Sequence, residues 1–524
     1  MISVFRINER RKEELMRIRN IFRNSFFSML SQFTLLVVGF FSQRAMNLHM
    51  GRELVGMNGV ISNVIAMLSV TELGVCTAIV YHLYGAVARN DQQEIASLMN
   101  LYRKAYHVFA AVIMMLGVLI LPFIHLFMKN HVYSVSYIRV LYMLWLLRTV
   151  LSYLLSYKKS LLIADQKEYV VSIVTLCMNV LNYSTIILIV TYTEKYLPAL
   201  VLNILIDAVL NICLSMYVDR RYPYLKELRK ARIEKSVMQT VVRDLKNIFV
   251  SRVSQKILTC TDNLIISGFI SVGVVGLYSN YCLITQNVSN ILIILSETIQ
   301  PSIGNLFIEK DYEKDYRVLR QLTFVFFLLI SVATAGLYSL IDPFVIDFWL
   351  GHSYELQWAT VLLCIAVCVI QGIGLPLMIV MGVTGLFPQE RNLSILTAVV
   401  NLTVSILLVK PLGVSGVLIG TCLSYLIQLL YRFFVFFRVY IHRECRRYGG
   451  DILEYIVLII LETLGVHWLI QQVYMEGNVW TFILSMLICC IVPMALNLLI
   501  YCASWRMRSV LGLFRLLRGQ DETV

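Results

Sequence analysis

The chain has 524 residues, of which 58% are hydrophobic and 15% charged, and its mean hydropathy is +0.74. A soluble globular protein holds about 25% charged residues, so this composition excludes the soluble classes. Lys and Arg outnumber Asp and Glu by 45 to 32, for a formal net charge of +13. In a membrane protein this excess is typical of cytoplasmic loops and does not indicate nucleic-acid binding.

The apolar residues fall into separate runs of membrane-spanning length, which is about 20 residues for a helix. Because lipid offers no hydrogen-bond partner to an open backbone, we expect an all-α, polytopic membrane helix bundle. The fourteen predicted spans are 25–48, 54–84, 104–127, 136–156, 169–192, 197–218, 247–270, 274–301, 320–340, 356–384, 392–409, 413–438, 452–473 and 480–502.

The positions of Lys and Arg predict the orientation of these spans. If the N-terminus is cytoplasmic and the chain crosses at every span, most Lys and Arg lie on the cytoplasmic side, as the positive-inside rule requires. The outer loops near 271–274, 341–355 and 474–479 then contain no Lys or Arg. We therefore expect both termini in the cytoplasm.

The two halves of the chain resemble each other. Three ordered pairs of segments match: NSFFSMLSQ (24–32) with NIFVSRVSQ (247–255), VGMNG (55–59) with VGLYS (275–279), and NDQQEIASLM (90–99) with KDYEKDYRVL (310–319). Each copy starts on the cytoplasmic side and contains six spans, so we expect parallel lobes related by an axis along the membrane normal. Two such lobes describe a transporter.

The predicted organisation has six parts. They are a basic cytoplasmic N-terminal segment (1–23), an N-lobe with spans one to six (24–218), a basic amphipathic connector (219–246), a C-lobe with spans seven to twelve (247–440), spans thirteen and fourteen (441–502) and a cytoplasmic tail (503–524). The connector mixes Lys and Arg with apolar residues, so we expect it to lie along the membrane surface.

The seventh span carries the clearest candidate site. Its start has Arg252 and Lys256 where the first copy has apolar residues. At about 100° per residue, Arg252, Lys256, Thr259 and Asn263 share one helix face. A charge at mid-membrane costs at least about 2.5–3.5 kcal/mol, so it usually faces a cavity or a partner. We interpret this stripe as a cavity face that binds an anionic substrate; a structural ion pair is the alternative.

Other ionisable residues inside spans are weaker candidates. Arg148 is a second cavity cation, whereas Arg44 lies near an outer end, where snorkelling is the ordinary explanation. The acidic candidates, which would pair between helices or carry a coupling ion, are Asp262, Glu72, Asp207 and Glu297. Whether that ion is Na⁺ or H⁺ stays open. The sequence contains no catalytic set, metal-ligand motif or dinucleotide loop, so we expect neither an enzyme nor a resident metal or cofactor.

Three segments, 39–106, YKKSLLIADQKEY (157–169) and CTDNLIISGFISVGVVGLYSNYCLI (260–284), resemble Wzx-type polysaccharide flippases. These belong to the multidrug/oligosaccharidyl-lipid/polysaccharide exporter superfamily. The resemblance implies that the protein moves an undecaprenyl-diphosphate-linked oligosaccharide to the outer leaflet of the bacterial plasma membrane, for capsule, exopolysaccharide or teichoic-type glycans. It implies membrane lipids and other glycan-assembly proteins as partners, and it strengthens Arg44 as a candidate substrate-binding residue. Similarity to fourteen-helix lipid II flippases suggests that spans thirteen and fourteen help hold the prenyl tail.

Other functions stay open at this point. A drug–cation antiporter or a lipid II flippase of the same superfamily would share the two-lobe plan, although an antiporter is expected to use a buried acidic site. An integral-membrane glycosyltransferase or polymerase typically needs a sizeable outer loop, and the longest one here has about fifteen residues. A scaffold for glycan assembly has no need for Lys256 at mid-depth.

Overall fold

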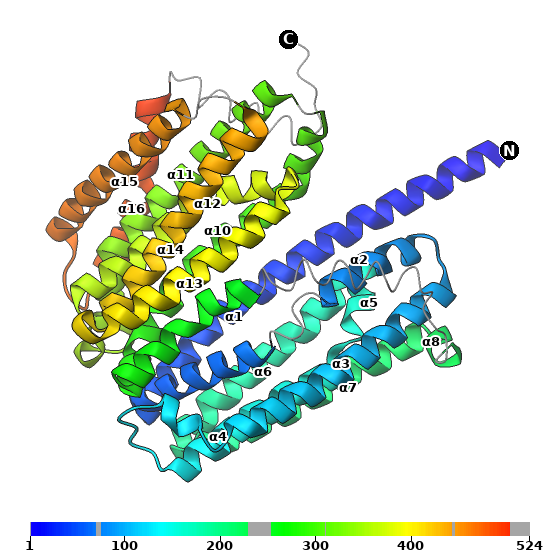
Figure 1. Cartoon of the computed structure of the whole chain (residues 1–524), viewed down its shortest axis with the longest axis horizontal. Helices are drawn as coiled ribbons and strands as arrows, with labels where there is room; N and C mark the ends of the chain where they lie inside the picture. Colours follow the sequence, from blue (N-terminus) through cyan, green and yellow to red (C-terminus); the bar gives the residue numbers. More distant parts are fainter. Residues whose placement is uncertain (1, 70–74, 229–252, 310, 443–445, 503–524) are drawn as a thin grey trace. The chain divides into compact units, whose positions relative to one another are not determined.

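The computed structural model describes residues 2–69, 75–228, 253–309, 311–442 and 446–502. Every regular element in these ranges is a helix, which confirms the predicted all-α class. The chain divides into two compact units (Figure 1). Unit 1 comprises 1–256 with 271–276, and unit 2 comprises 257–270 with 277–524.

Eleven helices of the described part are long and apolar enough to cross a bilayer on their own. The described residues of the other three predicted spans also lie almost entirely in helix. The first span and the start of the second lie in α1 (Ile2–Leu68), the second ends in α2 (Val75–Ala88), and the seventh includes the helical residues 253–269. The protein is therefore a multi-pass membrane helix bundle.

A single glycine separates the first two predicted spans. Gly51 has φ 80° and ψ 167°, which interrupts the helical backbone inside α1. Glycine adopts such a positive φ without a steric penalty because it has no Cβ. The hydroxyl of Tyr133 donates to the carbonyl of Met50 at 3.3 Å, which fixes the chain beside this break. The gap between the predicted spans, 49–53, contains this break.

The helices of unit 1 within the described residues 2–228 begin with α1 and α2. After α1 and α2 they are α3 (Gln92–Ile120), the 3₁₀ helix η2 (Ile124–Phe127), α4 (Val135–Ser156), α5 (Lys159–Ala164), α6 (Glu168–Thr193), α7 (Leu197–Arg221) and α8 (Tyr224–Glu227). α6 packs on α1 and on α7, and α4 packs on α3 and α7 (Figure 1). The predicted connector begins in α7 and α8, and its residues 229–246 lie outside the described residues.

Unit 2 contains the second set of long helices, the first of which begins in residues 272–276 of unit 1. They are α10 (Val272–Leu306), α11 (Tyr312–Pro343), α12 (Trp358–Val383), α13 (Phe387–Leu412), α14 (Val414–Val435), α15 (Arg446–Val473) and α16 (Val479–Tyr501). Short segments join them: η3 (Phe307–Glu309), the π-helix η4 (Phe344–Trp349), η5 (His352–Tyr354) and the π-helix η6 (Phe436–Ile441). α14 packs on α12 and α13, and α11 packs on α12, α15 and α16.

The two C-terminal helices are bound firmly to α11. The guanidinium of Arg320 donates to both carboxylate oxygens of Asp451 on α15, at 2.6 and 3.0 Å. Phe327 stacks on Tyr455 with ring centroids 4.4 Å apart, a kind of contact worth about 0.5–1.5 kcal/mol beyond burial. Asn497 of α16 donates to Ser331 of α11 at 3.2 Å. Helices predicted to lie outside the repeat therefore share the core of unit 2.

The repeat is visible in how two helices start. Asp91 caps α3 by accepting from the backbone N–H of Glu94, and Asp311 caps α11 by accepting from those of Glu313 and Lys314. These caps occupy matching positions of the third repeated segment. Each satisfies an amide that has no partner inside its helix.

Candidate functional site

The predicted stripe on the seventh span is described only in part. Arg252 lies outside the described residues. In the helix at 253–269, Lys256 and Asn263 are half-buried and Thr259 is exposed. The Oδ1 atom of Asn263 is buried and has no hydrogen-bond partner in the described part of the chain. A buried amide oxygen in this state retains its capacity to accept a hydrogen bond, as a ligand-binding position requires.

Asp262, on the same helix, belongs to a polar network with α13 and α14. The hydroxyl of Thr421 lies 3.1 and 3.3 Å from the two carboxylate oxygens of Asp262. Asn401 donates its side-chain amide to the Thr421 oxygen at 3.0 Å, and Thr261 donates to the Asn401 carbonyl at 3.2 Å. Three helices therefore bring a carboxylate, two hydroxyls and an amide together inside unit 2.

The chemistry of this network differs from that of an ion pair. The partner of the Asp262 carboxylate in the described residues is a hydroxyl, not the cation on another helix that an ion pair would need. The Thr421 oxygen also lies 3.4 Å from the backbone carbonyl of Val417, to which Ser405 donates at 3.2 Å. Carboxylate, hydroxyl, amide and backbone oxygens are the donors that hard cations prefer. Intramembrane Asp residues also serve as proton carriers.

In unit 1, the two ionisable residues that the sequence singled out, Arg148 and Asp207, neutralise each other. Arg148 of α4 donates to the carboxylate of Asp207 of α7 at 2.7 Å, and Asn182 of α6 donates to the other oxygen at 2.7 Å. The Arg148 guanidinium also lies 5.5 Å from the ring centroid of Trp145. The two side chains thus form an ion pair between helices α4 and α7.

The two networks use equivalent helices of the repeat. Asn182 and Asn401 lie on α6 and α13, the fifth predicted helix of each lobe, and each donates its amide to the helix that follows. The difference lies in charge. The carboxylate of unit 1 is paired with Arg148, whereas the partner of the Asp262 carboxylate is a hydroxyl.

The remaining predicted site residues are dispersed. Arg44 is exposed on α1 and Glu297 is exposed on α10, and neither forms an ion pair within the described residues. Glu72 lies outside the described residues. No set of three His, Cys, Asp or Glu side chains is grouped for metal binding in the part of the chain that the structure describes.

Unit 2 also has an apolar groove of about 330 Å³ that the sequence did not indicate. Its walls come from α10, α11 with η4, and α16. The lining residues are Ile284, Val288, Val332, Ala333, Gly336, Leu337, Leu340, Ile341, Phe344, Phe482, Met486, Cys489 and Cys490. A groove with this lining suits a hydrocarbon chain, because it offers apolar area and almost no hydrogen-bonding groups.

The sequence prediction missed Thr421, Asn401 and Thr261 because it selected candidates inside the spans mainly by their charge. One signal was present: Asn401 and Ser405 are four residues apart, on one face of an otherwise apolar helix. The partners of that face lie at distant positions of the chain. Their assembly depends on helix packing.

The fold is similar to those of solved transporters of the multidrug/oligosaccharidyl-lipid/polysaccharide exporter (MOP) superfamily. An inward-facing multidrug resistance MATE family transporter of this superfamily aligns with a TM-score of 0.64 and 12% identity, over 78% of this chain and 94% of its own. The lipid II flippase MurJ, in an inward closed conformation, aligns with a TM-score of 0.63 and 14% identity, over 91% of this chain and 99% of its own.

A third solved structure, a MOP superfamily transporter from Pyrococcus furiosus described as having a binding pocket of reverse polarity, has a TM-score of 0.58 and 12% identity, over 81% of this chain and 96% of its own. The sequence matches no protein-family model and no curated protein. These similarities show the fold, and the resemblance to Wzx-type flippases stays a prediction.

Proposed function

We propose that this protein is a flippase that moves an undecaprenyl-diphosphate-linked oligosaccharide from the inner to the outer leaflet of a bacterial plasma membrane by alternating access. The observation that carries this proposal is the apolar groove of unit 2, which is lined in part by α16. A drug has no long hydrocarbon tail that needs such a groove, whereas a prenyl-linked sugar does. We propose that the tail occupies this groove while the sugar crosses in a polar cavity.

The extent of the structural matches supports a lipid-linked substrate. The MATE family transporter aligns with 78% of this chain, and the lipid II flippase aligns with 91% although its TM-score is nearly the same. The larger coverage fits a chain with two helices beyond a twelve-helix plan. α15 and α16 are those helices here, and α16 contributes four side chains to the groove, Phe482, Met486, Cys489 and Cys490.

The diphosphate requires cationic contacts. We propose Arg252 and Lys256 as its main ligands, with Thr259 and Asn263 completing the face. Arg offers paired N–H groups to phosphate oxygens, and Lys offers a point charge. Arg148 is a weaker candidate for a diphosphate ligand because its guanidinium already donates a hydrogen bond to the Asp207 carboxylate. Arg44 remains a candidate because it is exposed.

We propose the Asp262 network as the site of the coupling ion. Its oxygen donors fit Na⁺, and the carboxylate alone would serve for H⁺. Asp262 and Thr421 would hold the cation, and Asn401 would orient the Thr421 hydroxyl through its amide N–H. The charge of the cation would replace the positive partner that the carboxylate lacks in the described residues. Binding of the ion would then favour one arrangement of three helices, the kind of differential interaction that drives a conformational change.

Reconstitution in liposomes tests both the proposed transport and the proposed headgroup site. Purified full-length protein is placed in liposomes with an undecaprenyl-diphosphate oligosaccharide, and an external lectin or glycosidase reports sugar that reaches the opposite leaflet. We expect transport by the wild type and a loss of at least tenfold in Arg252→Ala/Lys256→Ala. Lys410→Ala, which removes one exposed cation elsewhere, is the control. Equal transport by all three proteins would refute the assignment of the headgroup site.

The coupling ion is tested in the same vesicles. An imposed Na⁺ gradient and an imposed pH gradient are applied separately, and we expect one of them to accelerate transport. Asp262→Asn, which keeps the shape of the side chain and removes its charge, should abolish that acceleration and leave only the slow gradient-free rate. Acceleration that persists in Asp262→Asn would place the coupling site elsewhere.

A drug–cation antiporter is the second candidate function. The observation that favours it is the Asp262 carboxylate, an intramembrane acidic group whose described partner is not a cation. In the same liposomes, uptake of a lipophilic fluorescent cation in place of the lipid-linked sugar would support this alternative. The same assay with lipid II as the substrate distinguishes a flippase for this peptidoglycan precursor from a polysaccharide flippase.

A further inference from the structure

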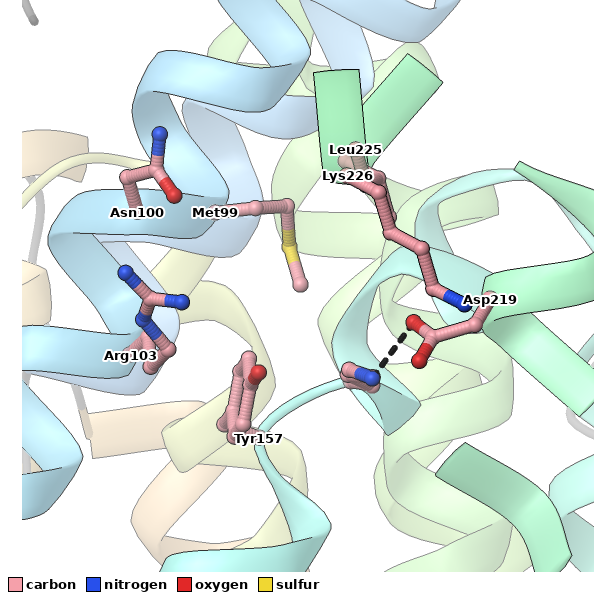
Figure 2. Close-up of a pocket in the computed structure, with 8 residues that line it drawn as sticks. Met99, Asn100, Arg103, Tyr157, Asp219, Leu225 and Lys226 are labelled. Atoms are coloured by element: carbon pink, nitrogen blue, oxygen red, sulfur yellow. Dashed lines mark hydrogen bonds and ion pairs between the residues drawn. The ribbon is translucent and has the colours of Figure 1, made fainter. Parts of the chain in front are cut away.

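A polar pocket of about 310 Å³ lies at one end of unit 1, apart from the networks described above. α3 contributes Met99, Asn100 and Arg103, the turn after α4 contributes Tyr157 and Lys158, the end of α7 contributes Asp219, and α8 contributes Leu225 and Lys226. In Figure 2, Arg103 and Tyr157 stand on one side of the pocket, and Asp219 and Lys226 stand on the other, with Met99 between them. The predicted orientation puts this end of the unit on the cytoplasmic side.

The charges around the pocket are unbalanced. Lys158 and Asp219 form an ion pair at 2.5 Å, with side chains 14% and 24% exposed, so they neutralise each other (Figure 2). Arg103 and Lys226 remain, and neither side chain has an ion-pair partner within the described residues. The lining as a whole therefore carries two net positive charges, from three cations and one carboxylate. Such a site favours an anion.

The walls are held in place before any ligand binds. Asn100 donates its side-chain amide to the carbonyl of Leu228 at 3.1 Å, which ties the end of α8 to α3. The hydroxyl of Tyr222 donates to the carboxylate of Asp165, which also accepts from Lys167 at 2.5 Å. Burial and the adjacent Asp165 carboxylate raise the pKa of Tyr222, so the phenol keeps the proton that it donates. A preformed pocket binds with a lower entropic cost than one that must be ordered.

We propose that this pocket is a binding site for a phosphate group, held between Arg103 and Lys226. A guanidinium binds two phosphate oxygens at once, and an ammonium on the facing wall supplies the second charge. The volume is at the lower end of that of small-ligand sites, about 300–1,000 Å³, and suits a headgroup. Met99 and Leu225 offer apolar contact to the carbon atoms that follow the phosphate in a lipid.

Two sources share this chemistry. One is the phosphodiester of an anionic membrane lipid, since basic pockets between membrane helices on the cytoplasmic side bind such headgroups. The other is free phosphate from the cytoplasm. The proposal is independent of the transported substrate, and its test measures binding, so its failure leaves the flippase proposal intact.

The test uses full-length protein in nanodiscs of phosphatidylcholine with and without a small fraction of phosphatidylglycerol, and native mass spectrometry counts retained phosphatidylglycerol. Inorganic phosphate is titrated separately against the protein in phosphatidylcholine alone, with ³¹P NMR as the readout. Arg103→Ala/Lys226→Ala removes the two lining cations that form no ion pair within the described residues. Lys104→Ala/Arg221→Ala removes two exposed cations that do not line it, and so matches the change in net charge.

We expect the wild type and the Lys104→Ala/Arg221→Ala control to bind one phosphate-bearing ligand, and the pocket variant to bind it at least tenfold more weakly, because each charge-assisted contact contributes about this factor. Arg103→Lys, which keeps the charge and loses the paired geometry, should give an intermediate affinity. Unchanged thermal unfolding in phosphatidylcholine shows that the variants fold.

The two measurements distinguish a lipid headgroup from free phosphate, and they can also refute the proposal. Retention of phosphatidylglycerol assigns the pocket to a lipid headgroup. Saturable binding of inorganic phosphate without lipid retention assigns it to free phosphate. Equal binding by the wild type and the pocket variant, or binding of neither probe to the wild type, overturns the proposal.

Discussion

Gly56 and Gly276, which occupy the same position in the two copies of the repeat, lie against each other in unit 1. A Cβ on Gly56 would lie 2.0 Å from the carbonyl oxygen of Val272 and 3.0 Å from the amide nitrogen of Gly276. A Cβ on Gly276 would lie 1.9 Å from the carbonyl oxygen of Arg52. The obstacles are backbone atoms, which have no rotamer by which to move away. The repeated glycines thus allow two helix segments to meet backbone to backbone.

Adding a methyl group at either glycine should therefore force this crossing apart. We expect Gly56→Ala and Gly276→Ala each to lower the free energy of unfolding by about 1–3 kcal/mol, the usual cost of overpacking. Thermal unfolding of the purified protein measures the change. Gly465→Ala is the matched control, because a Cβ on that helical glycine meets nothing within 4 Å, and alanine favours helix by about 1 kcal/mol. A loss in Gly465→Ala equal to the others would contradict this explanation.

The Arg148–Asp207 pair should behave as a coupled unit. Removing either charge leaves the other unpaired among apolar helices, at a cost of about 3–5 kcal/mol for a buried pair, and the upper part of that range is reduced here because the side chains are 24% and 15% exposed. We expect Arg148→Leu and Asp207→Leu each to destabilise the protein more than the double variant does.

A double-mutant cycle of thermal unfolding measures this coupling. Transport in the same liposome assay adds a second readout. If Arg148 binds the substrate diphosphate directly, Arg148→Leu will reduce transport even in the double variant, in which no charge is left unpaired. Stability effects that simply add would show that the two side chains act independently.

The sequence allowed much of the fold to be predicted, because apolar runs of fixed length report membrane helices directly. The starts of α3 and α11 were placed too late, at 104 and 320 instead of Gln92 and Tyr312. Their first turns are amphipathic and contain charged residues such as Glu94, so hydropathy alone excludes them. The caps Asp91 and Asp311 mark the true starts, and both lie in the repeated segment that the sequence comparison had identified.

The candidate site was less predictable for a geometric reason. Periodicity along one helix shows which residues share a face, but not which face of another helix lies opposite. Asp262 was identified from its charge, yet its partner Thr421 is 159 positions away and uncharged. Arg148 and Asp207 were both identified, but their pairing depends on the packing of α4 against α7. The apolar groove had no sequence signal, because its lining does not differ from other lipid-facing residues.

Thr421 provides a finer test of the proposed ion site than Asp262 does. Thr421→Val removes the hydroxyl next to the carboxylate and keeps the shape of the side chain, whereas Thr421→Ser keeps the hydroxyl. We expect Thr421→Val to raise the ion concentration for half-maximal acceleration of transport about fivefold, which corresponds to one lost hydrogen-bonding oxygen of about 1 kcal/mol. Thr421→Ser should remain within twofold of the wild type. Equal shifts in both variants would mean that packing, and not the hydroxyl, determines the effect.

The groove of unit 2 should determine which prenyl chains are transported. Ala333→Trp places a large side chain inside the groove, and Val457→Trp adds the same bulk on the exposed surface of α15, outside it. With diphosphate sugars on an undecaprenyl chain and on a chain of two isoprene units, we expect the wild type and Val457→Trp to prefer the long chain. The tail enters the groove from lipid and not from water, so the preference comes from the additional packing contacts that a longer chain makes along the groove. Ala333→Trp should transport the long chain at least tenfold more slowly and the short one at nearly the wild-type rate. An equal loss on both chains would indicate a general defect in transport, and no loss on either would remove the groove from the path of the substrate.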